Sequence, residues 1–562
     1  MSIPPSGPER TSPPAARRAF GAAAAALVVA HLLAATLLTP GYIVPDSLGT
    51  FAWLRSFVWS GDFLLFDEWA GFRLVRGGIT LFKEIAPTGA LANHWGVGAS
   101  LLSAPAYLAA HAASAARPDA NGFSGLYALA LGWTAILFGI ASSLAALAVL
   151  RDTGVRERTA AASILLTLVG TPMLWYEVRF PLGTHLAGLF CVAMLVLALA
   201  RLAPRASLGD VLAGALLGLA IVTRIQHVML APAVALHLAR SGDPARRFLR
   251  AALGAALPLA IQAVAWSAVY GHPFGPLVSG AAPLGGTWMA FGANALGESL
   301  LSSYHGLLPW APIFALAIAG WVFELRRERL AATLLLMFAA EWIANGLFDR
   351  YFWGGMAFGP RRFVDLAVPV MVGGGWLLRR ASAAGWIAAG AAAAWSALLF
   401  IAASSRTLDL AGDVRGADLV GAVAGIPWGA VPGALWGGTA LVRAPALFFG
   451  GAAIALLVGG LGVLIAGSRA RAAIALGLLL AAGLGASLAA FGPTRSGARR
   501  ELARYRIDVP AARVAGPMLD ARVLFLDELA FRRNRGRLEE ARETEALVRR
   551  IERALADVGV TP

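Results

Sequence analysis

Five of the six acidic residues in one segment near the start of the chain, residues 42–121, are candidates for acid–base chemistry. They are Asp46, Asp62, Asp67, Glu68 and Glu84. A carboxylate held beside apolar residues at a membrane surface can be desolvated and tuned as a general base. Asp46 precedes an expected helix, and this position equally suits an N-cap that accepts from free backbone N–H groups. The sequence is compatible with both roles in one residue.

The adjacent pair Asp67 and Glu68 provides a second set of carboxylates. On a helix, neighbouring side chains point about 100° apart, so one could face a site while the other meets solvent. A divalent metal could bind Asp46 with one of these two and water, but the spacing does not require it. Whether a metal binds here therefore stays open.

No P-loop, no GxGxxG after a strand and no HExxH is present, which argues against a nucleotide-driven pump.

Three arginines in apolar surroundings are the cationic candidates. Arg224 stands with His227 in GLAIVTRIQHVMLAPAV. Arginine is costly in a bilayer, so it either meets a ligand or carboxylate or extends its side chain to the interface. Arg361 and Arg362 stand in FGPRRFVDL, where two guanidiniums could clamp a phosphate or serve as interface anchors.

Three further polar residues begin predicted spans on the same side as Asp46. They are His185, Tyr304 and His305. Each could be structural, and their shared face makes them candidate substrate-binding residues as well.

The composition requires a membrane protein. Of 562 residues, 58% are hydrophobic and only 14% charged, with a mean hydropathy of +0.69, whereas about a quarter of a soluble domain is charged. Apolar runs of roughly 17 to 25 residues suit helices and lack the alternation of a barrel. The net charge of +15 comes mostly from arginines in short loops, which indicates orientation rather than nucleic-acid binding. The single cysteine, Cys191, allows no disulfide within the chain.

These runs predict an all-α, polytopic membrane protein with thirteen spans. A cytoplasmic tail (1–18) precedes a transmembrane domain (19–492), and a soluble, mainly helical tail (493–562) follows on the outer side. One missed span would reverse the location of that last tail. The predicted spans are 19–40, 124–150, 159–176, 183–201, 208–223, 226–240, 249–270, 306–324, 330–347, 362–378, 383–402, 445–466 and 472–491.

The first outer loop (41–122) contains two apolar segments that need not cross the membrane. Residues 47–60 suit a helix lying at the interface. Residues 94–111 are almost long enough to span, and crossing would place the basic segment 151–158 outside. A dip that returns leaves that segment in the cytoplasm, as the positive-inside rule prefers, so a dip is predicted.

The order of these features resembles a known family. One span, an outer loop with an early aspartate, interfacial helices and a late outer-face arginine pair are similar to the GT-C superfamily of polyprenyl-phosphate-sugar glycosyltransferases. Protein O-mannosyltransferases and aminoarabinose transferases belong to it. The segments that carry the resemblance are PDSLGTFAWLRSFVWSGDFLLFDEW, NHWGVGASLLSAPAYLAAH, SSYHGLLPWAPIFALAIAGW and FGPRRFVDLAVPV.

This resemblance implies transfer of a sugar from a polyprenyl-phosphate carrier to a lipid, glycan or protein acceptor at the extracytoplasmic face. The family's catalytic aspartate carries over to Asp46, and a second acid would be Asp67 or Glu68. By charge and predicted face, Arg224, Arg361 and Arg362 are the candidates that stabilise the departing phosphate. The alternative is a transporter or scaffold for lipid-linked glycans that kept this fold without catalysis.

Overall fold

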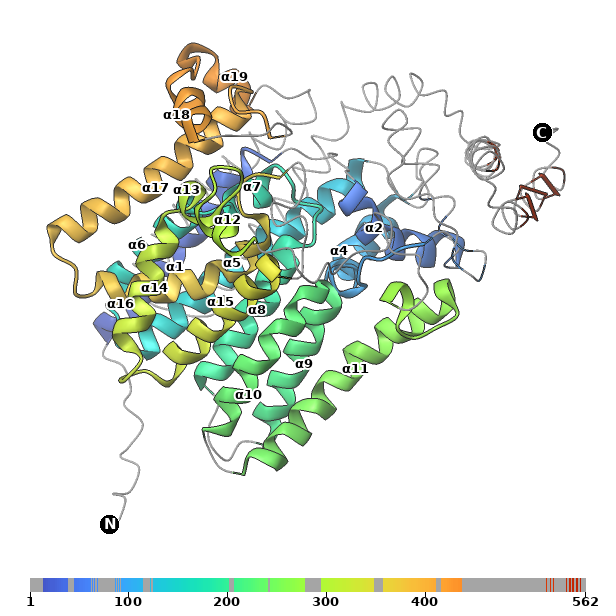
Figure 1. Ribbon diagram of the computed structural model, residues 1–562, viewed down its shortest axis with the longest axis horizontal. Coiled ribbons are helices and arrows are strands. Elements are labelled where there is room, and N and C mark those ends of the chain that lie inside the picture. The colour runs from blue at the N-terminus through green and yellow to red at the C-terminus, as the bar shows by residue number, and fades with distance from the viewer. Residues whose placement is uncertain are drawn as a thin grey trace.

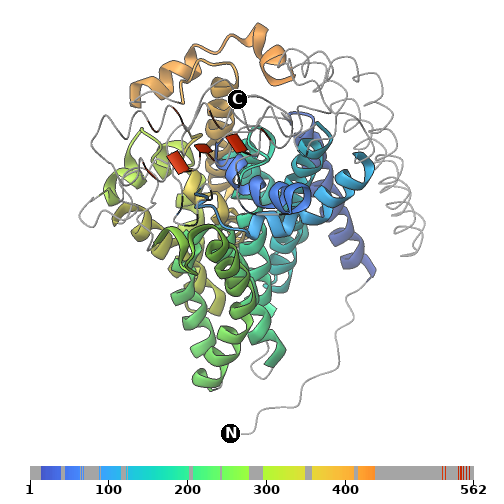
Figure 2. The same ribbon diagram turned by 90° about the vertical axis from the view of Figure 1, so that its right-hand side faces the viewer.

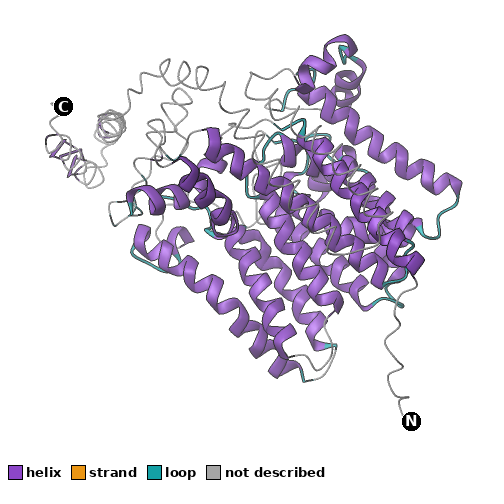
Figure 3. Cartoon of the chain, turned by 180° about the vertical axis from the view of Figure 1, so that it is seen from behind, coloured by secondary structure: helices purple, strands orange, loops and turns teal. Residues whose placement is uncertain are grey.

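The structure, a computed structural model, is helical throughout the part of the chain that it describes (Figure 3). That part comprises residues 14–38, 45–114 (without 62, 64, 66–67, 69–85, 87, 89 and 91), 122, 125–201, 207–240, 243–277, 295–347, 357–410, 416–436 and scattered positions between 522 and 556. Every regular element within it is a helix. The all-α prediction is thereby confirmed for these residues.

Helices occur where the apolar runs predict them. The predicted spans 445–466 and 472–491 lie outside the described residues, and each of the other eleven coincides with a helix or with two consecutive ones. In chain order these are α1 (Pro14–Ala35), α5 (Gly125–Asp152), α6 (Glu157–Gly170), α7 (Met173–Val178), α8 (His185–Arg201), α9 (Ser207–Thr223), η2 (Ile225–Leu230), α10 (Ala231–Ala239), α11 (Pro244–Tyr270), α13 (Leu307–Trp310), α14 (Ile313–Glu324), α15 (Arg329–Leu347), η4 (Arg361–Leu366), α16 (Ala367–Leu378) and α17 (Ala383–Ser404).

Length and hydropathy indicate an integral membrane protein. Four of the described helices contain stretches long and apolar enough to cross a bilayer, and a bent pair would make a fifth. These stretches are Arg18–Ala35, Tyr127–Asp152, Pro244–Tyr270 and Ala383–Ser404. Shorter apolar helices lie beside them. The total of thirteen spans stays a prediction.

The exposed face of helix α11 is apolar, which suits contact with lipid. Leu249, Leu253, Leu257 and Val264 follow one another at helical spacing, and each is at least 60% exposed. The opposite side of α11 packs on α9, where Gly254 approaches the backbone of Val211 so closely that a Cβ would clash. An apolar stripe that faces outward from a packed helix is stable in hydrocarbon rather than in water.

The basic loops predicted on the cytoplasmic side meet at one end of the bundle. Arg201 Nε lies 2.7 Å from Asp152 Oδ2, and Arg240 donates to the carbonyl of Arg329 at 3.2 Å. Arg379 also donates to the carbonyl of Thr153 at 2.9 Å. Because segments far apart in sequence converge here, the chain alternates direction as the charge pattern predicts.

The first outer loop packs at the opposite end. Its elements are α2 (Pro45–Arg55), a π-helical turn η1 (Ser56–Ser60) and α4 (Gly98–Ser114). Gly98, at the start of α4, packs against Thr223 at the end of α9, while His111 hydrogen-bonds Tyr127 near the start of α5 at 2.9 Å. Both ends of α4 therefore lie at one end of the bundle, as expected for a helix that does not cross (Figure 1).

The segment after α17 folds back as helices α18 (Gly416–Ala424), η5 (Trp428–Ala430) and α19 (Val431–Trp436). The segments Asp418–Ala424 and Trp428–Trp436 make an angle of 71° with each other. They lie at the end of the molecule opposite the α10–α11 connection (Figure 2). Arg179 anchors it by donating to the carbonyls of Ala434 and Leu435 at 3.2 and 3.1 Å. The sequence did not predict these helices.

The predicted tail 493–562 lies mostly outside the described residues. Among its described positions, Val548 is buried in the same apolar cluster as Leu48 and Phe51 of α2. Its fold and its side of the membrane stay predictions.

The core between the long helices depends on close backbone contact. Helix α16 is buried almost throughout, and it packs on α14 where Gly320 meets the carbonyl of Gly373. Small residues permit this approach, which gains van der Waals contact where no hydrophobic effect acts between helices in lipid. The buried polar residues described next are held by this rigid surround.

Candidate functional site

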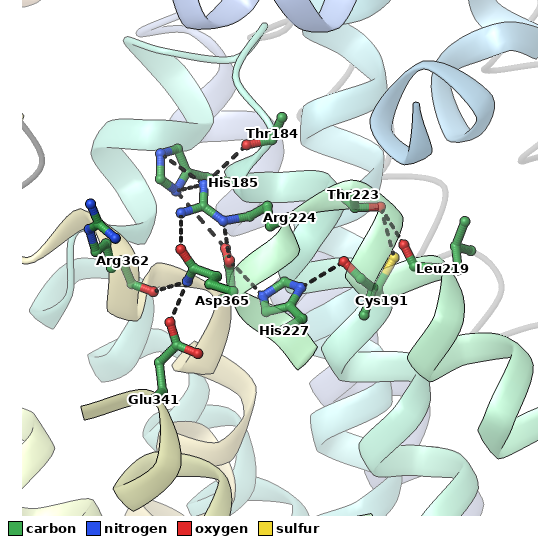
Figure 4. Close-up of polar contacts among 12 residues, drawn as sticks. Thr184, His185, Cys191, Leu219, Thr223, Arg224, His227, Glu341, Arg362 and Asp365 are labelled. Carbon is green, nitrogen blue, oxygen red and sulfur yellow. Dashed lines mark hydrogen bonds and ion pairs between the residues drawn. The ribbon is translucent and has the colours of Figure 1, made fainter. Parts of the chain in front are cut away.

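Arg224 organises a buried polar cluster toward the end of the bundle that carries α2 and α4 (Figure 4). It connects α9 to η2 in an extended conformation, with φ −147° and ψ 115°, so the helical path breaks and the guanidinium turns into the core. Its Nε lies 2.8 Å from Asp365 Oδ2. Nη1 donates to Thr184 Oγ1 at 3.0 Å and to His185 Nδ1 at 2.9 Å. The same Nη1 lies 3.3 Å from His185 Nε2. Arginine can only donate, so the histidine nitrogen that bonds it is the acceptor.

Asp365 is shared between Arg224 and His227. It lies in η4 and is 1% exposed, and its Oδ2 is 2.9 Å from His227 Nε2. The other ring nitrogen of His227 lies 2.9 Å from the carbonyl of Ala220, which can only accept. Both ring nitrogens therefore face acceptors, and one proton must lie between His227 and Asp365.

Gln226 joins this cluster to two further elements. Its Oε1 accepts from Arg224 Nη2 at 2.9 Å. Its Nε2 donates to Glu341 Oε1 on α15 in a short hydrogen bond and to the carbonyl of Arg362 at 3.1 Å. One side-chain amide therefore connects η2, α15 and η4.

Arg361 and Arg362 begin η4, and the carbonyl of Arg362 joins this network through Gln226. Gly359, at φ +60°, and Pro360 form the turn before them, and only glycine adopts this left-handed conformation without cost. Both arginine side chains are partly buried. Two adjacent cations at the edge of a buried polar cluster can recognise an anion such as a phosphate.

His305 lies near Arg361 in a strained conformation, with φ +58°. Its ring stacks on Trp310, with centroids 5.0 Å apart and planes 14° apart, and Tyr304 packs edge-on at 4.8 Å. Burial and the nearby Arg361 lower the pKa of His305 to about 4, against the opposing effect of the Gly359 carbonyl. The imidazole is therefore neutral at physiological pH.

This shift predicts a pH dependence of stability. Between pH 6.5 and 4 the unfolded chain binds a proton at His305 and the folded chain does not, so stability falls on acidification, by up to about 3 kcal/mol from this residue. We expect His305→Asn, which tolerates positive φ, to flatten the profile of melting temperature against pH in this range. An unchanged profile would contradict it.

The acids of the first outer loop are placed less completely. Asp46 lies in the first turn of α2, where a carboxylate is favoured by the helix dipole, but its side chain and all of Asp67 lie outside the described part of the structure. Glu68 is buried, and its Oε1 accepts from Arg55 Nη1 at 2.9 Å. Within the described residues, no group of three His, Cys, Asp or Glu side chains could hold a metal ion.

Residues 93–98 connect α2 to Arg224. Asn93 donates to the carbonyl of Gly49 in α2 at 2.8 Å. Gly96 and Gly98 in turn lie against the backbone of Val222 and Thr223, directly before Arg224. The loop that carries Asp46 thus packs on the turn that carries Arg224.

The structure therefore brings His185, Arg224 and the backbone of Arg362 together, with His305 beside Arg361. It adds Asp365, Gln226 and Glu341, which the sequence analysis did not select, and it gives His227 a partner. The available signal was an acid within an apolar run, which in a membrane span is a functional candidate by default. Arg224 was predicted to bind phosphate, and this stays a prediction.

The fold and this cluster define an all-helical integral membrane protein with a buried charged site. No family model and no curated protein matches the chain. Two solved structures are similar to it, both of ArnT from Cupriavidus metallidurans. The one bound to undecaprenyl phosphate has 18% identity and a TM-score of 0.46, over 84% of this chain and 76% of that one. The apo structure has 20% identity and a TM-score of 0.44, over 83% and 75%. The similarity to both structures is distant.

Proposed function

We propose that the protein is a membrane glycosyltransferase that takes a sugar from a polyprenyl-phosphate carrier at the extracytoplasmic face. One observation carries the proposal: the Arg361–Arg362 pair lies next to the Arg224–Asp365–His227 cluster. Both lie toward the end of the bundle opposite the basic loops. The sequence resemblance to GT-C enzymes supplies the reaction class. The acceptor would be a lipid, a glycan or a protein hydroxyl.

In this proposal each charged group has a distinct role. Asp46 removes the proton of the acceptor hydroxyl while its oxygen attacks the anomeric carbon. The bond from that carbon to the phosphate oxygen breaks, and the electron pair leaves with the phosphate. Arg361 and Arg362 stabilise the charge that develops there. Arg224 Nε lies 2.8 Å from Asp365 Oδ2, so its main role is to hold η2 and η4 together.

The phosphate role is tested by binding of undecaprenyl phosphate to the purified protein in detergent. We expect Arg361→Ala and Arg362→Ala each to weaken binding by about 10- to 100-fold, the size of a lost charge-assisted hydrogen bond. Arg380→Ala is the matched control, because Arg380 pairs with Glu324 at the other end of the bundle. Unaltered binding by both site variants would refute the clamp.

A further inference from the structure

The amide of Gln226 makes three hydrogen bonds, and both of its N–H donors are used. It accepts from Arg224, donates to Glu341 of α15 and donates to the carbonyl of Arg362 in η4. Its partners also fix its orientation, because a flipped amide would point its NH2 group at the guanidinium and its oxygen at two acceptors. We propose that Gln226 is a positioning residue that fixes the Arg361–Arg362 pair relative to the buried cluster.

Glu341 supplies the rigid end of this connection. It is 3% exposed on a helix whose other contacts are mostly apolar, so its carboxylate depends on the few polar groups that reach it. One of its carboxyl oxygens, Oε1, accepts from the Gln226 amide. Gln226 thereby links α15 to the start of η4.

The start of η4 needs such a contact because its local structure is weak. The turn before it contains Gly359 at positive φ, and its backbone bonds include the short-range ones from Arg361 to the Gly359 carbonyl and from Phe363 to the Pro360 carbonyl. A 3-10 turn holds its residues less firmly than an α-helix. The bond from Gln226 is a tertiary contact to the backbone of Arg362 itself.

This inference rests on the proposed phosphate role of the two arginines, and it is tested with two independent measurements. The first is the Kd for undecaprenyl phosphate. The second is hydrogen exchange of the backbone amides of residues 357–366 without any ligand. We expect Gln226→Leu to weaken binding about tenfold, and to speed exchange in this segment by a similar factor.

Thr333→Val is the matched control. Thr333 is buried on α15 and hydrogen-bonds His237 at 3.1 Å, so its loss also removes one polar contact of α15, away from the site. We expect this variant to bind and exchange like the wild type at residues 357–366. If Thr333→Val changes both measurements as much as Gln226→Leu does, general loosening of α15 explains the result and the proposal fails.

Exchanging the side chains at positions 226 and 341 tests the contact of Gln226 with Glu341 separately from its contact with Arg362. Gln226→Glu alone places two carboxylates together and should lower the melting temperature. In the double variant Gln226→Glu/Glu341→Gln, the amide at position 341 donates to the carboxylate at position 226, which still accepts from Arg224. The carbonyl of Arg362 nevertheless lacks its donor. We therefore expect the double variant to regain stability but not binding or slow exchange.

The outcomes distinguish this inference from the proposed function. If the double variant regains binding and slow exchange, or if Gln226→Leu changes neither, the positioning role is refuted. If the wild type does not bind undecaprenyl phosphate but Gln226→Leu still speeds exchange at residues 357–366, positioning of this segment holds and the phosphate function fails.

Discussion

Asp46→Asn is expected to lower the rate of sugar transfer by about 10²- to 10⁴-fold, the contribution of a positioned general base. Asparagine keeps the size of the side chain and can still serve at a helix N-terminus, so folding should be retained. Position 46 lies in the first turn of α2, which residues 93–98 connect to the turn at Arg224. Loss of transfer without loss of the fold would assign the base to this position.

The measurement is release of undecaprenyl phosphate from a panel of undecaprenyl-phosphate sugars, with a membrane lipid extract as acceptor. Binding of undecaprenyl phosphate itself should stay within about twofold of the wild type, since Asp46 acts on the acceptor. Equal turnover by Asp46→Asn and wild type would remove Asp46 as base. A wild type that binds the lipid but turns over no donor would support the transporter or scaffold alternative.

Asp365→Ala is expected to destabilise the fold by about 3–5 kcal/mol, because it leaves the buried guanidinium of Arg224 and the ring of His227 without their carboxylate. The side chain of Asp365 is 1% exposed and that of Arg224 is 12% exposed. The effect should appear as a lower melting temperature or a lower SDS midpoint in mixed micelles. Lipid binding should weaken as well, since η4 carries both Asp365 and the arginine pair.

Asp152→Ala is the matched control for this prediction. Its ion pair with Arg201 has a similar length, 2.7 Å, but the two side chains are 33% and 48% exposed, so its loss should cost at most about 1 kcal/mol. In Arg224→Ala/Asp365→Ala, both buried charges are removed together. The double variant should therefore lose less stability than the sum of the single ones. Additive losses would show that Arg224 and Asp365 are not coupled.

The sequence by itself determined where the helices lie and which loops share a side. Apolar runs of sufficient length must form helices in a bilayer, because every backbone N–H and C=O must be satisfied within the segment. The predicted runs 208–223 and 249–270 accordingly match α9 and α11 within a few residues. Arginine placement orients such helices, and the contacts among Arg240, Arg329, Arg379 and Thr153 agree with it.

The tertiary structure alone decided which polar residues meet. His227 and Asp365 are 138 residues apart, and Gln226 and Glu341 are 115 apart. Whether they touch depends on how each helix is rotated about its axis and how far it slides against its neighbours. Apolar composition all round the helix leaves that rotation unspecified, because no polar face marks the inside. Close contacts of small residues, such as Gly320 with Gly373, set the register. Arg224 could thus be recognised as costly from the sequence, but its partner Asp365 could not.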